Sequence, residues 1–230
     1  PARRQSHPFS VPTPKNFPVN RVEVLVRDVL QEYSDICKNA DEYPDGKLLT
    51  GTEHHIETTP GPPVRAKPRP LDPARLEIAK KFFAEMTAAG ICRRSSSPWA
   101  SALHMVPKKG GSWRCCGDYR ALNSRTIPDR YGLPRIKDFT AMLAGKTYFT
   151  TLDLLKGYYQ IPMHKDSIEK TAIITPFGCF EFLQLPFGVM NASSTFQRLI
   201  DTVLDGIPFV FKYLDDVIIA SPTLQDHVRD

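Results

Sequence analysis

Three aspartates stand where the sequence points most directly to chemistry. Asp215 and Asp216 are adjacent between two apolar runs in FVFKYLDDVIIAS, so a tight turn would place both at the tip of a buried hairpin. Asp153 lies inside the apolar segment TYFTTLDLL, where an ionised carboxylate is costly unless a cation or hydrogen-bond donors compensate it. Acidic residues are also good turn formers, and for the adjacent pair alone that interpretation is equally good.

Three carboxylates drawn together from two strands would repel one another, and a pair of divalent cations offsets such repulsion. Oxygen ligands of this kind suit Mg²⁺. Two ions roughly 3.5 to 4 Å apart can activate a primer hydroxyl and stabilise the leaving pyrophosphate of an in-line displacement. The sequence has no G-x-x-x-x-G-K-[ST] loop and no kinase signature, which excludes those other classes of phosphoryl-transfer enzyme.

The elements that must position the aspartates mix helices and strands without regular βαβ alternation, which predicts an α+β fold. Strands are expected at 147–154 and 209–221, and a hairpin with lysines at its tip at 102–117. Apolar residues at three- and four-residue spacing predict helices at 72–90 and after Asn191.

The N-terminal part, residues 1–70, is rich in proline. We expect a linker over 1–20, an amphipathic helix over 20–33, and an extended, solvent-facing arm over 43–70. His54 and His55 are adjacent in this arm, a spacing that does not put two ligands on one face, so both are expected to be exposed.

Composition bounds the function only loosely. A formal net charge of +5 and a pI near 9.0 are compatible with a polyanionic partner. The five cysteines are scattered and form no C-x-x-C pair, which indicates neither a disulfide framework nor a zinc knuckle and favours a reducing intracellular compartment. No apolar run approaches the roughly 20 residues of a membrane span, so we expect no membrane partner.

Five segments occur in an order typical of one family. LDLLKGYYQIPM, LPFGVMNASSTFQR and YLDD resemble three central motifs of reverse transcriptases. Upstream, SSSPWASALHMVPKKGGSW and WRCCGDYRALNSRTIPDRYGLPRI resemble the polymerase of gypsy-type LTR retrotransposons, the Metaviridae. The resemblance runs from about residue 48 to the end of the chain.

By this resemblance, Asp153, Asp215 and Asp216 are the catalytic, metal-binding carboxylates. The backbone carbonyl of Leu154 would help to hold two Mg²⁺ ions, for which Mn²⁺ could substitute. Tyr158 falls where the family places a bulky ring under the sugar of the incoming nucleotide. That ring would clash with a 2′-hydroxyl, so the resemblance implies deoxyribonucleoside triphosphates as substrates and DNA as product.

Four further residues are assigned to the nucleotide by the same resemblance. Arg114 matches an arginine that lies against the triphosphate, where its planar fork suits phosphate oxygens, and Lys108 is its expected companion. Phe187 and Gly188 match the floor of the nucleotide pocket. Without the resemblance, the two basic residues indicate a solvated hairpin tip and the other two a turn before a helix.

The resemblance also implies a right-hand polymerase with fingers at 71–130 and 161–191, a palm with an antiparallel sheet at 131–160 and 192–230, and no thumb within the chain. Protease, ribonuclease H and integrase would lie outside it. The expected partner is an RNA or DNA template with its primer, held mainly through phosphate and sugar contacts. The expected location is intracellular, in cytoplasmic virus-like particles and also in the nucleus.

Three departures from the family pattern affect local stiffness. Leu214 stands where relatives often have a smaller residue or another aliphatic, Gly132 replaces a usual proline, and Ser193-Ser194 replace a common Pro-Ala. None removes a catalytic group.

Two other functions stay open. A decayed or repurposed copy could bind nucleic acid or a partner protein without catalysis, and intact aspartates alone do not exclude it. An RNA-directed RNA polymerase would share the logic of the two-acid hairpin, but Tyr158 disfavours it.

Overall fold

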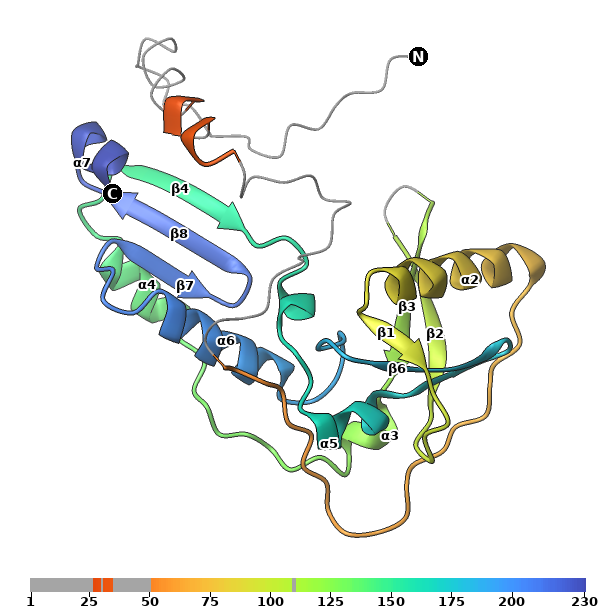
Figure 1. Ribbon diagram of the computed structural model, residues 1–230. Helices are drawn as coiled ribbons and strands as arrows, with labels where there is room; N and C mark the ends of the chain where they lie inside the picture. Colours follow the sequence, from red (N-terminus) through yellow and green to blue (C-terminus); the bar gives the residue numbers. More distant parts are fainter. Residues whose placement is uncertain (1–26, 30, 35–50, 109–110) are drawn as a thin grey trace, which may run out of the picture.

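A computed structural model describes residues 27–29, 31–34, 51–108 and 111–230. Two sheets lie on opposite sides of the molecule, with three strands on the left of Figure 1 and five on the right. Short helices and loops join the two sheets at the bottom, which gives the described chain the outline of a U (Figure 1). The mixture of helices and largely antiparallel strands confirms the predicted α+β class.

The five-stranded sheet has the order β1-β6-β5-β2-β3. Its strands are β1 (Cys92–Arg94), β2 (Ser101–Pro107), β3 (Trp113–Asp118), β5 (Ile173–Thr175) and β6 (Gly178–Phe182). Neighbouring strands are antiparallel except for β2 and β5, which run parallel. The β2–β3 pair confirms the hairpin predicted at 102–117.

Helix α2 (Pro73–Ala88) packs on this sheet. The Asp72 carboxylate caps the helix by accepting the Arg75 backbone N–H at 2.8 Å, and Pro73 occupies the first turn, where its missing N–H is harmless. Phe83, on the buried face, stacks on Phe180 of β6 with ring centroids 4.5 Å apart. The helix predicted at 72–90 is confirmed.

The three-stranded sheet has the order β4-β8-β7 and is antiparallel throughout. Its strands are β4 (Tyr148–Asp153), β7 (Val210–Tyr213) and β8 (Asp216–Ser221). Helix α6 (Ala192–Val203) packs on β7, and α7 (Leu224–Arg229) packs on β4 and β8. Helix α4 (Ile136–Met142) precedes β4 along the chain. The strands and the helix predicted in these regions are confirmed.

Short elements connect the two sheets: α3 (Arg120–Asn123), the 3₁₀ helix η1 (Gly157–Gln160), α5 (Lys165–Ile168) and the 3₁₀ helix η2 (Glu169–Thr171). One cluster of buried apolar side chains runs through the junction. It includes Phe83, Tyr119, Leu122, Ile161, Ile173, Leu185, Phe196 and Leu199. α2, the five-stranded sheet and α6 all contribute to this cluster, whereas the buried residues of the three-stranded sheet, Val210, Phe211, Val217 and Ala220, lie outside it.

The arm at 51–70 differs from its prediction. Its burial alternates from Glu53 to Glu57, so that His54 and Ile56 are buried, at 0% and 2% exposure, while His55 is exposed. Isolated bridges join His54 to Met163 in the parallel sense, and other arm residues to Thr126 and Ala100. The prediction that His54 is exposed is therefore wrong, because backbone pairing turns alternate side chains inward over this stretch, whereas His55 and most of residues 59–70 are exposed as predicted.

Little of the predicted N-terminal helix lies in the described part of the chain. Residues 27–29 and 31–32 are helical, and Val29 and Tyr33 are exposed, at 40% and 51%. The rest of that helix, the linker over 1–20 and the arm before residue 51 fall outside the described residues.

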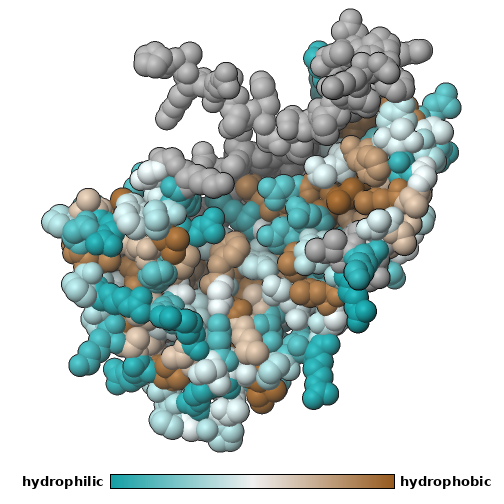
Figure 2. Space-filling view, turned by 180° about the vertical axis from the view of Figure 1, so that it is seen from behind, coloured by the Kyte–Doolittle hydropathy of each residue, from teal (hydrophilic) through white to brown (hydrophobic). Residues whose placement is uncertain are grey.

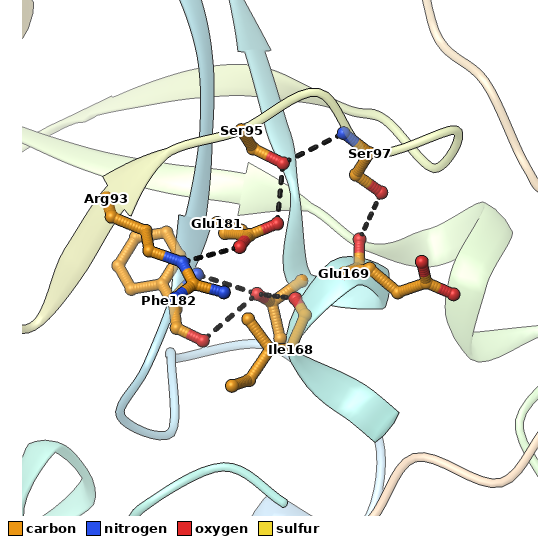
Figure 3. Close-up of polar contacts among 8 residues, drawn as sticks. Arg93, Ser95, Ser97, Ile168, Glu169, Glu181 and Phe182 are labelled. Atoms are coloured by element: carbon orange, nitrogen blue, oxygen red, sulfur yellow. Dashed lines mark hydrogen bonds and ion pairs between the residues drawn. The ribbon is translucent and has the colours of Figure 1, made fainter. Parts of the chain in front are cut away.

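A polar network fixes the loop after β1 to the five-stranded sheet (Figure 3). The Glu181 carboxylate, 8% exposed, accepts from Arg93 Nε at 2.7 Å and from Ser95 Oγ at 2.6 Å. The Ser97 hydroxyl then donates to the Glu169 carbonyl at 2.7 Å. These bonds compensate the buried carboxylate and tie the segment SSSPW to η2.

Apolar surface remains on the side of the three-stranded sheet. Brown side chains gather at the upper right of Figure 2, the side that carries this sheet. Phe149 and Leu152 of β4 are 42% and 36% exposed. Among the described residues, no helix has both the length and the apolar character needed to cross a bilayer.

Candidate active site

Strand pairing brings three aspartates to one end of the three-stranded sheet. Asp153 is the last residue of β4 and Asp216 the first of β8, and the two are Cα partners. Asp215 lies in the two-residue turn between β7 and β8, directly before Asp216. In Figure 1 this end of the sheet faces the middle of the molecule. The register thus unites the three acids that the sequence places on two distant segments.

The turn that carries Asp215 is held from below by α6. Leu214 has a φ of 52°, a left-handed conformation that is unfavourable for a residue with a bulky side chain. Its backbone N–H donates to Gln197 Oε1 at 2.9 Å, and Gln197, fully buried, donates from Nε2 to Asp201 at 3.1 Å. This hydrogen-bond pair fixes the turn against the helix.

Sequence reasoning missed Gln197. Its helical spacing of four residues from Asp201 was the available signal, because side chains at i and i+4 meet on one helix face. Its second contact, to the Leu214 backbone, depends on how α6 packs beneath the β7–β8 hairpin and has no local signature.

The electrostatics of the cluster centre on Asp215. Burial raises the pKa of this carboxyl first, and the charges of Asp153 and Asp216 raise it further. Its Oδ1 is buried and has no hydrogen-bond partner among the described residues. A carboxylate oxygen in that state is costly for the protein alone and is well suited to a cation.

Asp153 corrects one expectation. β4 is an edge strand and Asp153 is exposed, so the cost expected for an ionised carboxylate inside an apolar segment does not arise at Asp153. The cost of desolvation falls instead on Asp215 in the turn. Leu154 directly follows Asp153, and its side chain packs against the core, which anchors the backbone at this point.

An aromatic group adjoins the aspartates. The Tyr158 ring, on η1, lies 5.0 Å from that of Phe187 and 5.2 Å from that of Phe196, measured between centroids. Its hydroxyl is hydrogen-bonded to Ser193 Oγ at 3.1 Å. Burial raises the pKa of Tyr158, and the charge of Asp215 contributes to the shift, which marks the two groups as neighbours.

Ser193 therefore does more than alter stiffness at the start of α6. Where the family pattern has proline, this chain has a hydroxyl that orients Tyr158. Sequence reasoning noted the departure at this position but not the contact, since the two residues are far apart in the sequence.

Backbone contacts hold the turn that carries Phe187 and Gly188. Gly188 has a φ of +94°, which favours glycine, and its carbonyl accepts from Asn123 Nδ2 at 2.9 Å. Asn123 Oδ1 in turn accepts the Met190 N–H at 2.9 Å. Phe187 is 38% exposed, so one part of its ring is open to solvent while another contacts Tyr158.

The two predicted basic residues lie elsewhere. Arg114 on β3 and Lys108 just after β2 are exposed on the β2–β3 hairpin, on the other side of the U (Figure 1). Within the described residues, no ion pair or hydrogen bond joins either of them to the aspartates. The structure thus brings together Asp153, Leu154, Asp215, Asp216, Tyr158, Phe187 and Gly188, and places Lys108 and Arg114 apart from them.

Comparison with known proteins gives a consistent result. Residues 106–230, more than half of the chain, match the family described as reverse transcriptase (RNA-dependent DNA polymerase). The chain is 40% identical, in an alignment of 200 positions that covers 82% of it, to the retrovirus-related Pol polyprotein from transposon 297 of Drosophila melanogaster. It is 37% identical, in an alignment of 239 positions that covers 97% of this chain, to that from transposon gypsy of the same species.

These relatives are much longer proteins. The chain spans 19% of the transposon 297 polyprotein and 23% of the gypsy polyprotein. Among solved structures, prototype foamy virus protease-reverse transcriptase has a similar fold, with a TM-score of 0.80 at 23% identity over 93% of this chain and 28% of that one. A structure of the foamy viral protein in complex with an RNA/DNA hybrid gives a TM-score of 0.78 at 20% identity, with the same shares covered.

Proposed function

The chain belongs to the reverse transcriptase family, and from that premise we propose that it carries the polymerase centre of a gypsy-type retrotransposon Pol polyprotein. Its reaction is the transfer of a deoxynucleotide from its triphosphate to a primer 3′-hydroxyl, directed by an RNA or DNA template. The observation that carries the proposal is the meeting of Asp153, Asp215 and Asp216 at one end of a sheet.

The donor set fits two divalent cations. Three carboxylates offer only oxygen atoms, and the buried Oδ1 of Asp215 has no other partner among the described residues. Asp153, Asp215, Asp216 and the Leu154 carbonyl would hold Mg²⁺, with Mn²⁺ as a substitute. When bound, such ions supply activation of the primer hydroxyl and neutralisation of charge on the leaving pyrophosphate. The protein's own part is to hold the carboxylates in register while they repel one another.

Nucleotide selection falls to the aromatic group. We assign Tyr158 to the sugar of the incoming nucleotide, where its ring excludes a 2′-hydroxyl, and Phe187 and Gly188 to the floor beneath it. The contacts of Tyr158 with Phe187, Phe196 and Ser193 support this role, because a ring that selects by shape must be unable to move aside. Arg114 and Lys108 would meet the triphosphate from the opposite hairpin.

The two sheets support the proposed division into fingers and palm. The strands of the five-stranded sheet fall within 71–130 and 161–191, and those of the three-stranded sheet within 131–160 and 192–230. The foamy viral protein of similar fold is described with an RNA/DNA hybrid, which supports a template and primer lying across the palm. We place the polyprotein in cytoplasmic virus-like particles and in the nucleus.

The test is Mg²⁺-dependent extension of a DNA primer on an RNA template, with Asp215→Asn beside the parent chain. We expect extension by the parent and its loss in the variant, by a factor of at least about 10². Asp205→Asn, which removes an exposed carboxylate beyond α6, is the matched control and should extend like the parent. Equal extension by the parent and Asp215→Asn would overturn the assignment.

If the parent chain binds a primer–template duplex but does not extend it, in Mg²⁺ or in Mn²⁺, the result would favour the alternative of a copy that binds nucleic acid without catalysis. The same assay on a longer piece of the polyprotein then distinguishes decay from the need for further domains.

A further inference from the structure

Three side chains outside the aspartate cluster converge at the base of the molecule. Glu53 and His55 project from the same side of the arm, because burial alternates along it and His54 between them points inward. The His54 N–H donates to the Pro162 carbonyl and the His164 N–H donates to the His54 carbonyl, each at 2.9 Å. This parallel pairing sets His164 beside His55.

The two imidazoles are in contact. Their ring centroids are 4.2 Å apart and the planes are inclined by 24°. One ligand atom each from Glu53, His55 and His164 lies within 4.8 Å of the other two. An ion lies in the plane of each imidazole that binds it, so the two stacked rings must turn apart to share one. His55 and Glu53 are exposed and His164 is half-buried, which leaves room for rotations that bring the three atoms to the roughly 3.3 Å separation that bonds of about 2.0–2.2 Å to one tetrahedral ion require.

The donor set differs in kind from that of the aspartates. Two imidazole nitrogens with one carboxylate oxygen suit Zn²⁺ and neighbouring transition ions, whereas three carboxylates suit Mg²⁺. Asp166 lies beside His164: its backbone N–H donates to His164 Nδ1 at 3.4 Å, and its carboxylate is 3.8 Å from the same nitrogen. A ring nitrogen that accepts from an N–H carries no proton, so Nδ1 is the atom of His164 with a lone pair for an ion, which would replace this long hydrogen bond.

We propose that Glu53, His55 and His164 form a second metal site, which takes Zn²⁺ or a similar transition ion and fastens the arm to the segment before α5. The three residues come from two segments that lie far apart in the sequence, so an ion held by all three binds the folded chain and not the unfolded one. Ion binding therefore stabilises the fold by mass action. The proposal is independent of the polymerase assignment.

The experiment uses the purified chain, freed of metal and then titrated with Zn²⁺ or Co²⁺. At an ion concentration about 100 times the dissociation constant, we expect the melting temperature to rise by about 5 to 10 °C. Co²⁺ should give visible absorption typical of a low-coordinate nitrogen and oxygen site. His55→Ala and His164→Ala should lose both signals, and Glu53→Gln should weaken binding about tenfold or more.

Controls separate this site from other ligands. His104→Ala removes an exposed histidine on β2, which contacts Arg69, and the variant should respond to Zn²⁺ like the parent. Asp215→Asn should also keep the full Zn²⁺ response, because its cluster has only oxygen ligands. An unchanged response in His55→Ala, or a strong thiolate charge-transfer band that Cys116→Ser removes, would overturn the proposal.

Discussion

Asp153 and Asp216 are Cα partners across β4 and β8, although the chain passes through β5, β6, α6 and β7 between them. The pairing fixes two carboxylates at the end of an antiparallel ladder, and the adjacent turn adds Asp215. Hydrogen bonds of the ladder, rather than any local attraction, hold like charges together. The strand pairing therefore holds the three carboxylates together against their mutual repulsion.

Asp215→Asn should stabilise the protein in the absence of divalent ions. The pKa of Asp215 is raised by burial and by its two acidic neighbours, so its ionised form is less stable in the folded chain than in the unfolded one. In chelator at pH 7 we therefore expect a higher melting temperature for the variant than for the parent chain. Asp205→Asn should change it little.

The sign of the pH dependence follows from the same shift. A carboxyl with a raised pKa in the folded state loses stability as pH rises above its ordinary value, so the advantage of Asp215→Asn should be small in acid and full near neutrality. Mg²⁺ should stabilise the parent chain and not the variant. A variant that is less stable than the parent at pH 7 in chelator would contradict this account.

Gln197→Met should loosen the turn that carries Asp215. The change leaves the Leu214 N–H and an Asp201 oxygen without their buried partner, which costs about 1 to 3 kcal/mol in urea unfolding. Because Leu214 then relaxes from its left-handed conformation, Mg²⁺ affinity should fall as well. Thr202→Ala, on the exposed side of the same helix, should cost less than about 0.5 kcal/mol and leave Mg²⁺ affinity unchanged.

Ser193→Ala should relax the choice between ribose and deoxyribose. Loss of the hydrogen bond to the Tyr158 hydroxyl, worth about 0.5 to 1.5 kcal/mol, lets the ring yield to a 2′-hydroxyl. We expect ribonucleotide use relative to deoxyribonucleotide use to rise about 2- to 10-fold in primer extension. Ser193→Pro, tolerated in the first helical turn, should act alike, whereas Ser194→Ala should not. The positioning role of Ser193 would be refuted if Tyr158→Ala changes the ratio of ribonucleotide to deoxyribonucleotide use and Ser193→Ala does not.

His54 should make the fold sensitive to mild acid. Burial, and then the neighbouring His55, lower the pKa of His54 to about 4 from 6.5, so the unfolded chain binds the proton more readily. Stability should fall as pH decreases from 6.5 toward 4, by at most about 1.4 kcal/mol per unit and about 3 kcal/mol in all. Unfolding free energies at several pH values measure it, and in His54→Gln the slope in this window should be shallower.

Local signals predicted the long elements of the fold. The Asp72 cap, Pro73 and Gly90 mark α2, and the apolar runs on either side of the aspartate pair mark β7 and β8. The strands β1 and β5, with three residues each, are too short for any periodicity and exist because neighbouring strands pair with them. The inward turn of His54 likewise depends on pairing with a distant segment.

The candidate site divides in the same way. Motif resemblance predicted the aspartates and Tyr158, and the strand register explains why the aspartates meet. The contacts of Gln197 with Leu214 and of Ser193 with Tyr158 were not predictable, because each links residues that only the folded chain brings together. The exposure of Asp153 could not be predicted from the apolar residues around it, since an apolar pattern does not distinguish an edge strand from a central one.

The order of strands along the chain limits how the protein can be divided. The polypeptide completes β1, β2 and β3 of one sheet, crosses to contribute β4 to the other, returns for β5 and β6, and crosses again for β7 and β8. No single cut therefore yields two intact halves: a break between β4 and β5 leaves both sheets incomplete on either piece. We expect a chain that is cut by a protease in that connection, or split there by design, to have the native fold only while its two pieces are associated.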